Sequence, residues 1–194
     1  VLLETGHAFS SELFAIARHL VRLADELPKK SQDRLREYRD SNLESLKFQL
    51  FSPAPIYPDL ERVKLNASLT FLAERSRTFD QRQLLRRDFI SEILAGKNPA
   101  NRAADLVTGT KLADVTERRK LFDGGKAAIE ASTDSLIRLA RAIDSESRKL
   151  RNLYEEEIEE PERQAYAKIA EARFKALGKS IAPDATFTLR LAFG

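Results

Sequence analysis

The sequence has no cysteine, no methionine and no tryptophan among its 194 residues. The absence of cysteine excludes disulfide bonds and thiolate metal sites, and it leaves the redox compartment open. Because the chain starts at Val1 and not at a methionine, we expect it to be processed or to be a piece of a longer polypeptide. Glycine and proline are also sparse, with seven of each, so long stretches are free of residues that break helices.

Long apolar runs and a strong excess of one charge are missing too. No apolar stretch approaches the roughly 20 residues that cross a bilayer, and the first residues lack the basic start and cleavage site of a signal peptide. The 33 basic and 30 acidic residues give a net charge of +3, and the two signs alternate at short range, as in residues 117–120. Nucleic-acid binding would instead gather basic side chains on one face. We therefore predict neither a membrane partner nor a nucleic-acid partner.

The pattern that is present is a helical periodicity. Apolar residues recur at steps of three and four through most of the chain, which predicts helices with a buried face. The expected helices cover residues 9–27, 31–51, 58–74, 80–95, 98–107, two short segments separated by Gly124-Gly125, residues 135–144 and residues 145–177. The helix over 58–74 is apolar on two sides, so we expect it to be sandwiched between neighbours. We predict an all-α fold, an antiparallel bundle of about seven to eight helices.

The last residues have a different character. Residues 186–193 alternate in hydropathy and are rich in β-forming residues, which predicts a strand. A single strand in a helical chain would leave its backbone groups unpaired. We therefore expect the sheet that it joins to lie in sequence beyond Gly194.

The sequence contains no constellation that predicts catalysis. His7 and His19 are the only histidines, and on one helix they would stand about 120° apart, too far round to share a metal or a proton. No phosphate-binding loop and no nucleophile turn occur. The acidic residues in 155–162 are typical of a solvated helix surface, with a cation site as the lesser alternative. We assign no catalytic residue, no metal and no cofactor to this chain.

One polar residue stands out on physical grounds. On the expected helix over 31–51, Asn42 falls within about 40° of Leu35, Tyr38 and Leu46, inside the apolar stripe. A buried amide without partners costs about 1–3 kcal/mol. One interpretation is a buried asparagine that bonds a neighbouring backbone or sets the register of the helix, and this is the more common case. The other is an amide aimed into a cleft, where it binds a ligand.

Three stretches resemble a known family when taken in order. They are residues 38–47, beginning Tyr-Arg-Asp-Ser-Asn, residues 134–140, Asp-Ser-Leu-Ile-Arg-Leu-Ala, and residues 183–191, Pro-Asp-Ala-Thr-Phe-Thr-Leu-Arg-Leu. Together they resemble the bacterial dipeptidyl peptidase 7 and 11 family of serine exopeptidases. That family has a chymotrypsin-like double β-barrel, with a large helical domain inserted between its catalytic His/Asp part and its catalytic Ser part. The resemblance implies that residues 1–182 are this helical lid domain and that residues 183–194 begin a barrel strand.

The resemblance also implies a function. In the family, the helical domain covers the active-site cleft and helps to restrict cleavage to dipeptides from a free N-terminus. An asparagine in a Tyr-x-x-x-Asn-like helix helps to bind the α-amino group of the substrate, and Asn42 is the matching residue here. Pro161, in the middle of the last helix, is a candidate hinge. The expected partners are peptide substrates and the β-barrel domains of the same polypeptide, with a homodimer left open and a periplasmic or exported location.

Two other functions are considered beside this one. The first is a helical interaction or scaffold module with no peptidase role, whose apolar stripes would receive partner helices. The second is a helical sensor that binds a small ligand. A gene that continues into a serine-peptidase motif would favour the lid domain, whereas ligand binding by the isolated chain would favour the sensor.

Overall fold

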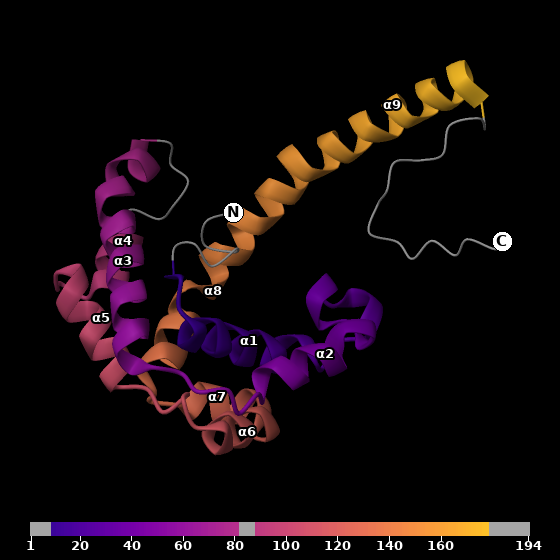
Figure 1. Ribbon diagram of the computed structural model, residues 1–194. Helices are drawn as coiled ribbons and strands as arrows, with labels where there is room; N and C mark the ends of the chain where they lie inside the picture. Colours follow the sequence, from indigo (N-terminus) through magenta and orange to yellow (C-terminus); the bar gives the residue numbers. More distant parts are fainter. Residues whose placement is uncertain (1–8, 82–87, 179–194) are drawn as a thin grey trace. The chain divides into compact units, whose positions relative to one another are not determined.

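A computed structural model describes residues 9–81 and 88–178, and every regular element within these ranges is helical (Figure 1). The predicted all-α character is therefore confirmed for the described residues, while the predicted strand over 186–193 lies outside them. The chain divides into two compact units, residues 1–151 and residues 152–194, which are described separately below. No helix within the described ranges is both long enough and apolar enough to cross a membrane.

The first helix, α1 (Glu12–Glu26), agrees with the predicted pattern and is capped from two sides. The Ser11 side chain accepts a hydrogen bond from the backbone N–H of Phe14 at 3.2 Å. Glu61, which lies on the helix that begins at Pro58, reaches the N-terminus of α1. There it accepts from the Ser11 hydroxyl at 2.6 Å and from the Leu13 N–H at 3.2 Å. A carboxylate at a helix N-terminus is favourable because the first N–H groups have no partner inside the helix.

The predicted continuous helix over 31–51 is wrong. Residues 31–39 form two short 3₁₀ turns, η2 (Ser31–Asp33) and η3 (Arg36–Tyr38), and α2 (Asp40–Leu50) starts only after them. The backbone leaves the helical path where it meets the end of α1, since the Leu35 N–H donates to the Glu26 side chain at 2.8 Å instead of to a carbonyl one turn back. A tertiary contact of this kind leaves no periodic signal in the sequence.

The long helix α3 (Pro58–Gln81) runs beyond its predicted end at Glu74. Leu65, Leu69 and Leu72 are buried on the side where α3 packs along α5 (Pro99–Thr108), and the two helices lie side by side in Figure 1. Its second apolar side is exposed, with the side chains of Leu60 and Val63 more than half accessible. The prediction of a sandwiched helix is therefore wrong for the described part of the chain, because neighbours cover α3 on one side.

The short helices between α3 and α8 begin and end close to the predicted boundaries. The helix predicted over 80–95 is realised as the end of α3 and as α4 (Phe89–Leu94), with residues 82–87 outside the described ranges. Asn98, where the helix predicted over 98–107 begins, caps α5 by accepting from the Asn101 N–H at 2.8 Å. α6 (Val115–Asp123) and α7 (Gly125–Ala131) meet at the predicted glycine pair, and both pack against α1 (Figure 1). A Cβ at Gly124 would lie 2.4 Å from that of Ala128, so only glycine fits this junction.

The end of the described chain differs from the prediction in its boundaries. α8 (Ser135–Tyr154) begins directly after Asp134, whose carboxylate accepts from the N–H groups of Leu136 and Ile137. It continues through the expected break at Ser145, because Ile143 and Ser147 both lie in its buried face. A π-helical turn, η4 (Glu155–Glu159), and α9 (Glu160–Leu177) follow.

The π-helical turn stands directly before Pro161, the residue that we named as a candidate hinge. Proline has no N–H to donate, and its ring collides with the carbonyl four residues back. A wider i→i+5 turn at this point relieves both conflicts. The prediction that Pro161 is a hinge concerns motion and stays a prediction.

Candidate functional site

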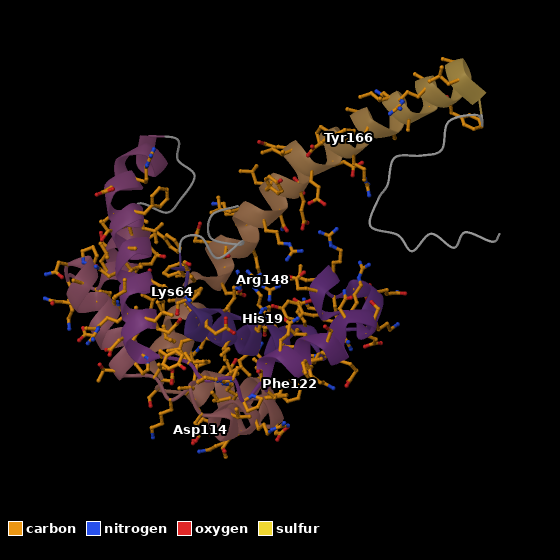
Figure 2. All side chains as sticks on the ribbon, in the orientation of Figure 1. His19, Lys64, Asp114, Phe122, Arg148 and Tyr166 are labelled. Atoms are coloured by element: carbon orange, nitrogen blue, oxygen red, sulfur yellow. The ribbon has the colours of Figure 1, made fainter. Side chains whose placement is uncertain are left out.

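The main polar feature of residues 1–151 is a set of buried charges between α1, η3 and α8. Arg22 and Glu26 on α1 are 1% and 0% exposed. Arg22 binds Asp144 through Nε at 2.8 Å and donates to the Ser147 hydroxyl at 3.3 Å. Arg148, labelled in Figure 2, donates to Asp144 at 2.6 Å and to Glu26 at 2.7 Å. These contacts connect two helices that are more than 100 residues apart in sequence.

Two further residues extend this set to the 3₁₀ turn η3. Arg151 binds both carboxylate oxygens of Glu37, with N···O distances of 2.6 and 3.2 Å. We call the whole set the charge cluster; it consists of Arg22, Glu26, Glu37, Asp144, Arg148 and Arg151. Burial disfavours the ionised form of Glu37, but the hydrogen bonds from Arg151 outweigh it and hold the pKa of Glu37 below its ordinary value. Glu37 is thus ionised at neutral pH and lies in direct contact with the Arg151 guanidinium.

A neutral pair lies beside the charge cluster. His19 Nδ1 is 3.1 Å from the Tyr38 hydroxyl, and Tyr38 is fully buried. Burial, together with the nearby charges of Arg18 and Arg22, lowers the pKa of His19 from 6.5 to about 4. Burial raises the pKa of Tyr38 well above its ordinary value. His19 is therefore uncharged at neutral pH, where its role is to hold Tyr38 and with it η3.

The state of His19 predicts a pH dependence of stability. Between pH 6.5 and about 4, His19 is protonated in the unfolded chain but unprotonated in the folded one. This contribution to stability is therefore complete above pH 6.5 and is lost as the pH falls toward 4. The free energy of unfolding of the wild type should therefore fall by about 3 kcal/mol between pH 6.5 and about 4 through His19 alone. We expect this fall to be absent from His19→Gln, whose side chain can still bond Tyr38. Urea unfolding at several pH values measures it, and equal pH slopes for the two proteins would contradict it.

Asn42 lies in the first turn of α2 and is exposed, so the prediction that it is buried in an apolar stripe is wrong. The stripe assumed a helix from residue 31, whereas α2 begins at Asp40. The Asn42 side-chain Nδ2 donates to the Arg36 carbonyl at 2.8 Å. This is the bond to a neighbouring backbone that one of the two interpretations required, although at the surface. Because a carbonyl can only accept, the NH₂ end of the amide must face Arg36.

The second polar atom of the Asn42 amide is its oxygen, Oδ1. None of the described residues donates to Oδ1, and the bond from Nδ2 to Arg36 prevents the amide from turning over. A fixed carbonyl-type oxygen at the surface can accept from an ammonium or amide group of a ligand. The Asn42 amide is therefore suited to bind a ligand that carries N–H donors.

The described residues do not group into a centre for bond cleavage. His19 is the one histidine in the described ranges and faces Tyr38, while His7 lies outside them. No set of three or more His, Cys, Asp or Glu side chains within the described ranges is placed to hold a metal ion. The acidic residues predicted as a solvated surface include Glu160, which pairs with Arg163, three residues along the same helix.

Sequence reasoning missed the charge cluster, although two signals for it exist. Arg22 and Glu26 are four residues apart on one helix, as are Asp144 and Arg148 on another, so each pair lies on a single helix face. The same spacing is common on solvated surfaces, and only the packing of α1 against α8 shows that these charges are buried.

Over the described residues, the fold and the site together define a helical protein in which the charge cluster holds a segment that contacts an exposed amide. The model of one protein family, described as Peptidase S46, matches residues 1–194, which is the whole chain. The chain therefore belongs to the Peptidase S46 family, the family of dipeptidyl peptidases 7 and 11. This confirms the resemblance seen in the three sequence stretches.

Proposed function

We propose that this chain is the helical domain that covers the active-site cleft of a serine dipeptidyl aminopeptidase and restricts cleavage to dipeptides at a free N-terminus. The observation that carries the proposal is the Asn42 amide, exposed on α2 and held through Nδ2 at 2.8 Å from Arg36. Membership of the Peptidase S46 family supplies the dipeptidyl peptidase context.

The amide suits the amine end of a peptide for a chemical reason. A free α-ammonium group brings up to three N–H donors, and Oδ1 of Asn42 is an acceptor that no described residue occupies. A hydrogen bond to a charged group contributes about 1.5–3 kcal/mol. A peptide with a blocked N-terminus loses the charge, and a helical lid over the cleft would exclude longer extensions sterically.

Several further features belong to the same proposal. Residues 1–182 would form the lid, and residues 183–194 would enter a β-barrel of the same polypeptide. The partners would then be peptide substrates and those barrels, in a periplasmic or exported enzyme. Pro161, after the π-helical turn η4, would be the hinge for opening and closing the lid. Whether two copies associate is a separate question, which the mass of the enzyme in solution answers.

Replacing Asn42 by alanine in the complete peptidase tests the proposal. We expect kcat/KM for a fluorogenic dipeptide amide to fall about 10- to 100-fold, which corresponds to a lost charge-assisted hydrogen bond. The analogue in which hydrogen replaces the α-amino group should be cleaved equally well by both enzymes. Ser45→Ala, on the same helix and also exposed, is the matched control. An Asn42→Ala enzyme that still distinguishes the two substrates as the wild type does would refute the amine-binding role.

A further inference from the structure

Residues 35–37 include the carbonyl of Arg36, which accepts a hydrogen bond from Asn42. Each of these three residues makes a contact that holds the segment in place. The Asn42 amide bonds to the carbonyl of Arg36. Immediately before that carbonyl, the Leu35 N–H donates to Glu26 at 2.8 Å. Immediately after it, the Glu37 side chain is held by Arg151 through two hydrogen bonds. The position of the amide is therefore set through η3, and not by α2 alone.

Both carboxylates that hold this segment are bound by arginines of α8. Arg148 donates to Glu26 at 2.7 Å, and Arg151 donates to Glu37 at 2.6 and 3.2 Å. The two arginines are three residues apart, so they project from neighbouring positions on the last turns of α8. A displacement of this part of α8 would disturb the contacts of both Glu26 and Glu37, which flank the Arg36 carbonyl.

We propose that Arg151 and Glu37 are positioning residues for the substrate amine: their bidentate pair ties η3 to α8 and thereby holds the oxygen of Asn42 where it meets the substrate. This inference rests on the proposed function of Asn42. The pair is suited to the task because the planar guanidinium and carboxylate fix orientation as well as distance. Glu37 is partly accessible, with 36% of its side chain exposed, so it can be changed without opening a buried hole.

The test compares Glu37→Gln and Arg151→Met with Asn42→Ala in the complete peptidase, on a dipeptide amide and on its analogue without the α-amino group. A displacement of the Asn42 amide by about 1 Å is enough to weaken its binding of the substrate amine strongly. We expect KM for the amine-bearing substrate to rise about tenfold in each positioning variant, with kcat within about twofold of wild type. The analogue should be unaffected. In the Asn42→Ala background neither change should have any further effect, since the residue that they position is gone.

Lys126→Ala is the matched control, because it also removes a long-range ion pair, 3.0 Å to Asp25, but one between α7 and α1. It should leave both substrates unchanged. If Glu37→Gln or Arg151→Met impairs both substrates equally, or if their effects multiply with that of Asn42→Ala, the positioning role is overturned while the role of Asn42 stands. If Asn42→Ala itself leaves amine discrimination intact, the proposed function fails and this inference fails with it. Should Arg151→Met not fold, Glu37→Gln alone decides between these outcomes.

Discussion

Replacing Arg118 by methionine is expected to lower the free energy of unfolding by about 4 kcal/mol. The Arg118 side chain is 2% exposed and extends from α6 into a set of backbone carbonyls. Its guanidinium donates to the carbonyls of Leu50 and Ser52 at 3.1 Å each, and to those of Leu112 and Ala113 at 2.6 and 3.0 Å. Methionine fills similar volume but leaves these acceptors without a donor, so the loss comes from unsatisfied polar groups.

The neighbouring residue provides the control for this prediction. Arg119 is exposed and stacks over the Phe51 ring, 4.4 Å from its centroid. Arg119→Met should lower stability by at most about 1 kcal/mol. Arg118→Lys should fall between the two, because one ammonium group cannot reach all four carbonyls. Urea unfolding followed by circular dichroism measures each value, and an Arg118→Met protein as stable as Arg119→Met would show that the carbonyls are satisfied in another way.

Replacing Asp144 by leucine is expected to lower the free energy of unfolding by about 3–5 kcal/mol. Arg22 is 1% exposed, and its Nε is bound to Asp144 at 2.8 Å. Without the carboxylate, Arg22 stays charged at any accessible pH and keeps a buried positive charge with its closest counter-charge removed. Arg148 loses the same partner but retains Glu26 at 2.7 Å.

A second substitution separates the cost of the buried charge from a loss of packing. Arg22→Met combined with Asp144→Leu should recover most of the stability, because two apolar side chains of similar volume leave no charge uncompensated. Asp25→Ala, which removes the exposed ion pair to Lys126, should change stability by less than about 1 kcal/mol. A double variant no more stable than Asp144→Leu would locate the loss in packing, and the assigned role of the ion pair would be wrong.

Acid should destabilise the chain through the same groups. Burial opposes ionisation of Glu26, Glu37 and Glu61, but hydrogen bonds to their carboxylates outweigh it and hold their pKa values below the ordinary glutamate value. Their contribution to stability is therefore present above that ordinary value and is lost as the pH falls through their lowered pKa values. The glutamates act at lower pH than most of the range over which His19 acts. The His19→Gln protein should therefore show the loss of stability from the glutamates alone.

The sequence by itself determined the elements that local chemistry controls. The cap at Asn98, the break at Gly124-Gly125 and the end of α9 at Gly178 all follow from residues within a few positions of each other. The periodic spacing of apolar residues was enough to predict the helical character of residues 9–81 and 88–178. Three short motifs were enough to predict the family, because they record ancestry and not packing.

Tertiary structure decided what depends on distant residues. Whether residues 31–39 continue α2 is settled by Glu26 taking the Leu35 N–H, and whether Asn42 is buried follows from that. Within the ranges that the structure describes, neighbours cover one apolar side of α3 and leave the other exposed, although both look alike in the sequence. The charges of Arg22 and Asp144 become a buried pair only when α1 meets α8, 122 positions later. Local propensity is a sum over neighbours in sequence, whereas burial is a property of the neighbours in space.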